Sequence, residues 1–384
     1  MKYFKNIQEK DGVLTFELHS NQKVYKSLAN AIRRTIIAQI PTIAIDKSNV
    51  IYLKNTSVLN SEVLSKRLAL IPINYKNAKK LDLEKLEIKL DANNDTDNIK
   101  DIFVSDFQIF EGEKEIDIKT LVEHDDILYI KLKPFQSLVL KAQFMESTLE
   151  KNGAEFTPTS VAIFTFAEDT QTLQKALNNI PADEKKDFTI LNKERIYLQD
   201  KNGEPSIFNF TFETVGQIPN KNLFDQGMEI LINKLDHVVK ALMENDREII
   251  YIDIPKIAMN AFDFMLPDEN DTLGNLLQTY LVKNDKVSFA GYDITHPLRK
   301  VLIIRLALKN NNNLENNKTV FIENITEIKK FIMELRKDLN STTVKTIAKT
   351  ITKEDNVKTT ESSTKASVKT QVKTQAKTKK IIVK

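Results

Sequence analysis

The sequence contains no cysteine and no tryptophan, and only eight of its 384 residues are glycine. The absence of cysteine excludes disulfide bonds, thiolate zinc sites and iron–sulfur clusters. With so few glycines, we find no glycine-rich loop of the kind that cradles phosphate groups. No run of eighteen uncharged apolar residues occurs, and residues 1–12 lack the apolar segment of a signal peptide. We therefore expect a soluble protein that is neither secreted nor membrane-spanning.

Charge is unevenly distributed along the chain. The total is +3, but residues 341–384 hold eleven lysines and three acidic residues, a net charge of +8 that leaves −5 for residues 1–340. A mildly acidic body is poorly suited to binding DNA along its surface, because such binding depends on basic residues that neutralise phosphates. The lysine- and threonine-rich end has no aromatic residue and predicts a disordered tail. Its two interpretations are a solubilising extension and an electrostatic tether to nucleic acid or to an acidic partner.

Four segments have the apolar periodicity of helices. Ser27, Thr272 and Asn220 are predicted to cap three of them, and Pro41 to end the first. In the two longer segments the apolar residues are spaced by alternating steps of three and four, which is typical of a narrow helix-packing seam. We predict that these two helices pack on each other through seam residues Phe224, Met228, Leu231, Leu235 and Val238 of one and Ile325, Ile328, Ile332 and Leu335 of the other.

Strand signals lie between the helices, and the chain also resembles itself. Eight short segments are rich in β-branched and aromatic residues, several with period-two alternation, so the mixture predicts an α+β fold. "SLANAIRRTIIAQIPTIAID" and "TLGNLLQTYLVKNDKVSFAGYD" both begin with the motif Ser/Thr-Leu-x-Asn, where x is any residue. In each stretch the motif opens a predicted helix, and a predicted strand follows that starts at Ala44 in the first and at Ala290 in the second. Two copies of one unit, made of a strand, a capped helix, further strands and a long helix, indicate a fused pseudo-dimer.

The first of these stretches resembles a known family. "NAIRRTIIAQIPTIAID" followed by "IYLKNTSVLNSEVLSKRLALIPI" is similar to the signature of the alpha-like subunits of multisubunit RNA polymerases, namely the third-largest subunit of RNA polymerase II and its archaeal counterpart. "DDILYIKLKPFQSLVLKAQF" and "EFTPTSVAIFTF" resemble later strands of the insert domain in that family. The second half, with "TLGNLL", "AGY" and "HPL", resembles the smaller partner, the eleventh subunit of RNA polymerase II and its archaeal counterpart. Both in one chain resemble the RNA polymerases of large cytoplasmic DNA viruses.

This resemblance divides the chain into predicted domains. Residues 1–48 and 172–245 form the first dimerisation domain, and residues 49–171 form a mostly β insert of about 120 residues. Residues 246–340 form the second dimerisation domain, and residues 341–384 are the disordered tail.

The resemblance implies a structural role in transcription. It implies a non-catalytic platform on which the second-largest and then the largest catalytic subunits assemble, with small subunits like the tenth and twelfth beside it. Magnesium and zinc are expected on those partners and none in this chain, since the zinc or iron–sulfur site of many relatives needs cysteines that are missing here. DNA or RNA is expected to be contacted only indirectly or through the tail, and a membrane not at all. The implied location is intracellular, in the host cytoplasm at a viral factory and in the virion, with the nucleus as the alternative.

Two arginines stand out in the first helix. Consecutive helical residues lie about 100° apart, so Arg33 and Arg34 cannot both share the apolar face. One interpretation is a solvated face. The resemblance favours a contact with a large subunit made by Arg33, Arg34, Asn30 and Arg67, because a planar guanidinium suits carboxylates and carbonyls. The corresponding motif of the second copy comprises Thr272, Leu273, Gly274, Asn275, His296 and Pro297.

No residues form a convincing catalytic or metal site. The four histidines, His19, His124, His237 and His296, are scattered, and His296 before a proline is predicted to shape a turn. The acidic clusters lack the spacing of a calcium loop or a paired-aspartate magnesium site. We therefore predict no catalytic residue and no metal ligand. The alternative function is nucleic-acid binding through the basic tail, and a free-standing enzyme is disfavoured.

Overall fold

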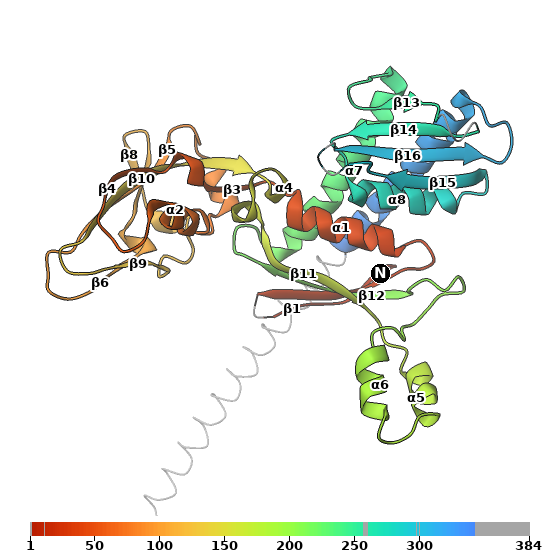
Figure 1. The fold of residues 1–384 in the computed structure, drawn as a ribbon, viewed down its shortest axis with the longest axis horizontal. Helices are drawn as coiled ribbons and strands as arrows, with labels where there is room; N and C mark the ends of the chain where they lie inside the picture. Colours follow the sequence, from red (N-terminus) through yellow and green to blue (C-terminus); the bar gives the residue numbers. More distant parts are fainter. Residues whose placement is uncertain (1, 11, 256–259, 297, 299, 342–384) are drawn as a thin grey trace, which may run out of the picture.

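The computed structural model describes the chain except for residues 1, 11, 256–259, 297, 299 and 342–384. The fold is α+β, as predicted, with two similar units of sheet and helices and an insert within the first unit (Figure 1). The predicted disordered tail at 341–384 lies, apart from Ser341, outside the described residues.

The first unit is a four-stranded antiparallel sheet with two helices. Its strand order is β1-β2-β12-β11, and β2 alternates buried and half-buried residues, as its sequence pattern predicts. One helix follows the second strand of the unit and the other follows the last. The elements are β1 (Phe4–Lys10), β2 (Val13–His19), α1 (Lys26–Ala38), β11 (Thr159–Phe166), β12 (Ile207–Thr214) and α7 (Asn220–Glu244).

The second unit repeats this topology, which confirms the predicted duplication. Its strand order is β13-β14-β16-β15, so in both units the fourth strand in sequence lies between the second and the third. A long helix at residues 314–341 follows the last strand, as α7 does in the first unit. The other elements are β13 (Tyr251–Asp253), β14 (Phe262–Pro267), α8 (Asp271–Val282), β15 (Val287–Asp293) and β16 (Val301–Leu308).

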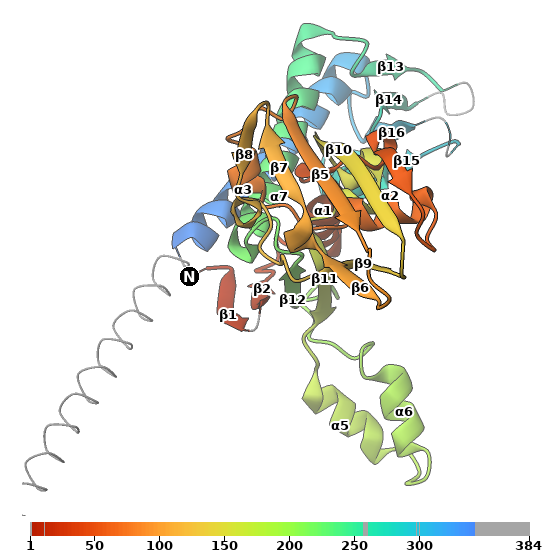
Figure 2. The same ribbon diagram turned by 90° about the vertical axis from the view of Figure 1, so that its left-hand side faces the viewer.

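The insert forms a separate lobe with its own core (Figures 1 and 2). Its larger sheet runs β3-β10-β5-β7-β8, with β4 also paired to β10, and β6 pairs with β9. The elements are β3 (Thr42–Ile45), η1 (Lys47–Asn49), β4 (Ile51–Asn55), α2 (Ser61–Ala69), α3 (Tyr75–Ala78), β5 (Leu86–Asn93), β6 (Lys100–Phe103), η2 (Val104–Asp106), β7 (Gln108–Glu111), β8 (Lys114–Ile116), η3 (Ile118–Thr120), β9 (Leu128–Leu132), β10 (Ser137–Ser147), α4 (Leu149–Asn152) and η4 (Ala154–Phe156).

Strand pairing corrects the predicted limits of the insert. β3, assigned from the sequence to the first dimerisation domain, pairs with β10, and its Ile43 and Ile45 lie in the core of the insert. β11, assigned to the insert, pairs along its length with β12 of the first unit. The insert therefore spans about residues 42–158, and β11, rather than the strand at Thr42, is the counterpart of β15.

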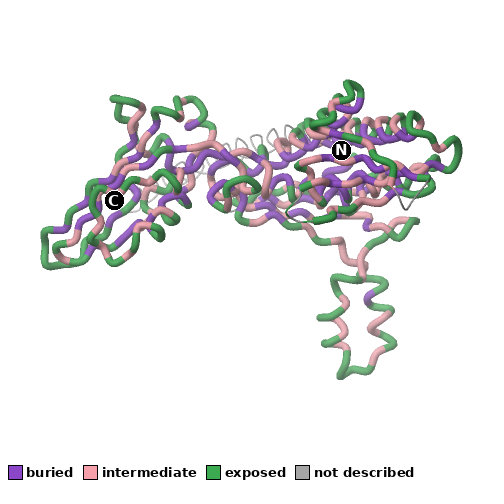
Figure 3. The backbone as a smooth tube through the Cα atoms, turned by 45° about the horizontal axis from the view of Figure 1, so that its top comes forward, coloured by how far each residue is buried: buried purple, intermediate pink, exposed green. Residues whose placement is uncertain are grey.

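A helical hairpin between β11 and β12 was not predicted. It consists of α5 (Thr170–Asn178) and α6 (Lys185–Asn192) and projects away from the sheet (Figure 2). Most of its backbone belongs to exposed or half-buried residues (Figure 3), and Leu173 is the buried residue of α5. Its two helices are only nine and eight residues long, so each shows an apolar face over little more than two turns.

The predicted helix caps are wrong. Ser27 and Thr272 lie inside the first turns of α1 and α8, and Asn220 is the first residue of α7. The residue that caps α8 is Asn270, whose side chain accepts a hydrogen bond from the backbone N–H of Thr272. Asn220 instead donates its side-chain N–H to the carbonyl of Gly12. The residues before α1 and α7, Tyr25 and Pro219, make no side-chain hydrogen bond to the first turn of either helix.

The two units share one hydrophobic core. Apolar residues of both four-stranded sheets and of α1, α7, α8 and the helix at 314–341 belong to a single buried cluster. α1 contacts both α7 and α8, so the central helix of the first unit packs against its counterpart in the second. The units therefore form one body, beside which the insert lies.

Candidate functional site

The two long helices run side by side in opposite directions. Arg336 binds the carboxylate of Asp225 through Nε and Nη2, at 2.7 and 2.8 Å, and Lys329 pairs with Asp236 farther along. Residues late in one helix thus meet residues early in the other. The Arg336 guanidinium holds the pKa of the Asp225 carboxyl below its usual value.

The predicted seam residues lie in the shared core. Each of them is buried in the cluster that joins the two units, and Asp225 and Asp236 of the ion pairs lie on the flank of that apolar face of α7. They are Phe224, Met228, Leu231, Leu235 and Val238 of α7, and Ile325, Ile328, Ile332 and Leu335 of the helix at 314–341. Their burial connects the two units by apolar contact, while charged pairs flank the contact.

Two glycines mark close helix packing. A methyl group added at Gly227 of α7 would lie 2.6 Å from Cγ1 of Ile36 in α1. One added at Gly274 of α8 would lie 2.6 Å from Cδ2 of Tyr292 and 2.7 Å from Cδ1 of Leu302. Gly227 therefore allows α7 to approach α1, and Gly274 allows α8 to lie flat on its own sheet.

The second-unit motif is mostly structural. Thr272, Leu273 and Gly274 are buried in the first turn of α8, whereas Asn275 is exposed. His296 is exposed, and its Nδ1 accepts a hydrogen bond from the backbone N–H of Leu298, in keeping with the predicted turn. Pro297 lies outside the described residues.

The arginine pair makes contacts within the chain. Arg33 donates through Nε and Nη2 to Oδ1 of Asn30, at 3.2 and 2.9 Å, and burial together with the nearby Arg34 lowers the pKa of its guanidinium. Arg34 is exposed, and its Nε donates to the hydroxyl of Thr272 in the second unit at 2.8 Å. Arg34 thus connects the two units, a role that the sequence did not suggest.

Arg67 lies apart from these residues, on α2 of the insert. Its guanidinium donates to the backbone carbonyls of Leu128 and Tyr129 in β9, both at 3.0 Å. These bonds attach α2 to the smaller sheet of the insert. The four predicted interface residues therefore occupy two lobes rather than one patch.

An exposed apolar strip on the insert was missed from the sequence. Ile51 and Leu53 of β4, with exposed fractions of 51% and 69%, lie on one face of a strand that pairs only with β10 among the described strands. Val58 in the following turn, and Val63 and Leu70 around α2, are also exposed, but the Tyr52 hydroxyl bonds to α2, so Ile51 and Leu53 on either side of it point away from that helix. The signal was present in "IYLKN", where residues i and i+2 are both large and apolar, but the burial of the opposite face depends on the tertiary structure. Apolar side chains on a strand with an open edge suit the addition of another protein.

The described part of the chain holds no group of three His, Asp or Glu side chains that could bind a metal ion. None of its described helices is long and apolar enough to cross a membrane. The partly buried ion pair between Lys234 of α7 and Glu269 before α8 joins the two units, and burial raises the pKa of Glu269. These charged groups thus serve the junction between the units.

Comparison with known proteins agrees with this architecture. Residues 21–235 and 261–338 each match a family model described as RNA polymerase Rpb3/Rpb11 dimerisation domain, and the first match alone spans more than half of the chain. Subunit 3 of DNA-directed RNA polymerases II, IV and V of Arabidopsis thaliana is 24% identical over 60% of this chain and 88% of its own. Subunit Rpo3 of Pyrococcus furiosus is 24% identical over 62% of this chain and 96% of its own length. Subunit RPB3 of RNA polymerase II of Schizosaccharomyces pombe is 27% identical over 57% of this chain and 80% of its own length. The chain therefore belongs to the Rpb3/Rpb11 dimerisation-domain family and is an alpha-like subunit of a DNA-directed RNA polymerase.

Proposed function

We propose that this chain is the non-catalytic assembly platform of its RNA polymerase, on which the second-largest and then the largest subunit assemble. The observation that carries the proposal is the combination of two joined dimerisation units with an exposed apolar strip on the insert. The shared core completes the dimer within one chain, so the strip at Ile51 and Leu53 is left for another protein to cover.

We assign the strip to the second-largest subunit. Edge strand β4 offers it apolar side chains and unpaired backbone groups, and Arg67 at the neighbouring helix α2 adds a cation. The flank of α1 that carries Arg33 and Arg34 stays our prediction for a further contact with a large subunit. Small subunits like the tenth and twelfth are proposed to bind beside the platform.

We further propose that catalysis and metals reside on those partners. The sequence has no catalytic motif, and the absence of cysteine rules out the thiolate site of some relatives. Instead of such a metal site, apolar packing stabilises the insert, including the contact between the rings of Phe107 and Tyr129, whose centroids lie 5.0 Å apart. We propose intracellular action, in the cytoplasm and virion of a large DNA virus, because two units in one chain resemble that arrangement.

The experiment is a matched pair of substitutions in the strip and elsewhere. Leu53→Glu and Ile190→Glu each place a carboxylate on a side chain that is 69% exposed, the first in β4 and the second in the helical hairpin. We expect both variants to melt like the wild type, and only Leu53→Glu to lose most of its capture of the co-expressed second-largest subunit. Equal capture by the two variants would contradict the assignment of the strip.

A second candidate function rests on the charge of +8 at residues 341–384. Binding of DNA or RNA through these residues would weaken steeply with salt and disappear when they are deleted. The platform function predicts that the same deletion leaves subunit capture unchanged. Loss of capture on deletion would instead assign the assembly contact to the basic segment.

A further inference from the structure

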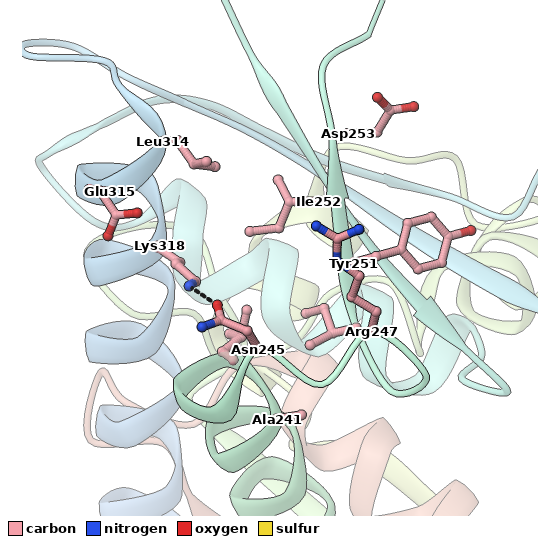
Figure 4. Close-up of a pocket in the computed structure, with 11 residues that line it drawn as sticks. Ala241, Asn245, Arg247, Tyr251, Ile252, Asp253, Leu314, Glu315 and Lys318 are labelled. Atoms are coloured by element: carbon pink, nitrogen blue, oxygen red, sulfur yellow. Dashed lines mark hydrogen bonds between the residues drawn. The ribbon is translucent and has the colours of Figure 1, made fainter.

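A groove with a volume of about 790 Å³ lies beside β13 (Figure 4), at the far side of the molecule from the lobe that the insert forms (Figure 1). Its walls are the last turn of α7, the connection into β13 and the first turn of the helix at 314–341. Leu242, Ile250, Ile252 and Leu314 form its apolar surface. The groove is therefore a feature of the junction where the two units are joined in one chain.

One side of the groove is an open sheet edge. Among the described strands β13 pairs only with β14, in register from Tyr251 opposite Met265 to Asp253 opposite Asp263. In an antiparallel pair, backbone N–H and C=O groups alternate between the two sides of a strand. Some backbone groups of β13 thus have no strand partner, and an extended chain can add there as a further strand.

The counterpart of this groove in the first unit is filled. Aligning Phe224 of one seam helix with Phe321 of the other places Ala241 at the position of Asp338. The Asp338 carboxylate accepts hydrogen bonds from the backbone N–H groups of Lys2, Tyr3 and Phe4, and the Tyr3 ring is fully buried against Phe331.

The open edges of the two units also differ. β1 has a bulge between Lys5 and Gln8 and a positive φ at Asn6, devices that discourage strand addition. No bulge interrupts the pairing of β13, and Ala241 offers no side-chain acceptor at the equivalent place. Only the second unit therefore keeps both an unfilled groove and a regular edge.

Charge indicates what kind of segment fits. Within the described part of the chain Arg247 has no carboxylate partner, and it lines the groove together with Ile252 of the edge strand (Figure 4). Lys318 donates to the neutral side-chain oxygen of Asn245, at 2.7 Å. Glu315 lines the opposite wall and Asp253 the outer end of β13, so the favourable place for an anion is next to Arg247.

We propose that this groove binds an extended acidic segment of a partner protein. The segment adds to β13 as a fifth strand, seats an apolar side chain against Ile252 and Leu314, and places a carboxylate on Arg247. This contact is independent of the platform function, since it uses neither the insert nor α1.

The test uses the full chain and a panel of labelled nine-residue peptides in which Glu or Thr alternates with Val, Ile or Phe. We expect saturable binding by fluorescence anisotropy, slower amide exchange in Tyr251–Asp253, and loss of binding when the central residue of the peptide is proline. Arg247→Glu should weaken binding at least about tenfold, the factor that corresponds to 1.4 kcal/mol. Arg195→Glu makes the same charge change at an exposed arginine in the turn that follows the helical hairpin, and it should not weaken binding.

Three results would overturn the proposal. They are the absence of binding across the panel, equal binding of the proline peptide, and equal effects of the two arginine substitutions. A melting curve of Arg247→Glu that matches the wild type ensures that lost binding reflects the groove and not unfolding.

Discussion

Leu231 of α7 offers the sharpest test of the core that joins the two units. Its side chain is 1% exposed and belongs to the cluster shared by both sheets and the long helices. Leu231→Ala removes three buried carbon atoms and leaves a cavity, which costs about 2–5 kcal/mol. Leu231→Asp adds an unpaired buried carboxylate to that loss, several kcal/mol more. A domain at the lower end of the usual stability of about 5–15 kcal/mol would be largely unfolded by the second change.

The assay is urea unfolding of the full chain, followed by circular dichroism. Asn233→Asp is the matched control, because it adds the same charge to an exposed position two residues along the same helix and should shift stability by no more than about 0.5 kcal/mol. Leu231→Ala keeps the test decisive if Leu231→Asp does not fold. Equal midpoints for Leu231→Ala and Asn233→Asp would refute the shared core between the long helices.

Three further predictions concern single contacts. Gly274→Ala should lower the melting temperature, since overpacking against Tyr292 costs about 1–3 kcal/mol and outweighs the helix propensity gained; an unchanged or higher melting temperature would contradict the close packing. Asp225→Asn should cost about 1 kcal/mol at pH 7. Arg336 lowers the pKa of the Asp225 carboxyl in the folded state, so the stability from this ion pair is present above the unfolded pKa of about 3.9 and is lost as the pH falls through the folded pKa. If Asp225→Asn were as much less stable than the wild type at pH 2 as at pH 7, the ion pair would be excluded as the source of the difference. Arg33→Ala with Arg34→Ala should keep the chain folded but weaken capture of the second-largest subunit, and unchanged capture would remove α1 from the interface.

Periodicity was sufficient to predict the seam helices, most strands and the duplication. Apolar residues spaced by three and four, as from Phe224 to Val238, can form a continuous stripe only on a helix, and the alternation in "VLTFELH" suits only a half-buried strand. These patterns are local, so they can be recognised without any knowledge of the partner surface. The family signature in "NAIRRTIIAQIPTIAID" likewise lies in one short stretch.

Partners distant in sequence decided the rest. β3 and β11 have the strand pattern that the sequence predicts, but their sheets are chosen by pairing with β10 and β12, about 100 and 50 residues away. The same holds for Arg34, whose hydrogen bond reaches Thr272. The exposure of Leu53 also depends on what covers each face of its strand. Local sequence thus specifies which elements form, because their periods are properties of single segments, whereas sheet membership, insert limits and exposed surfaces arise only when those segments pack.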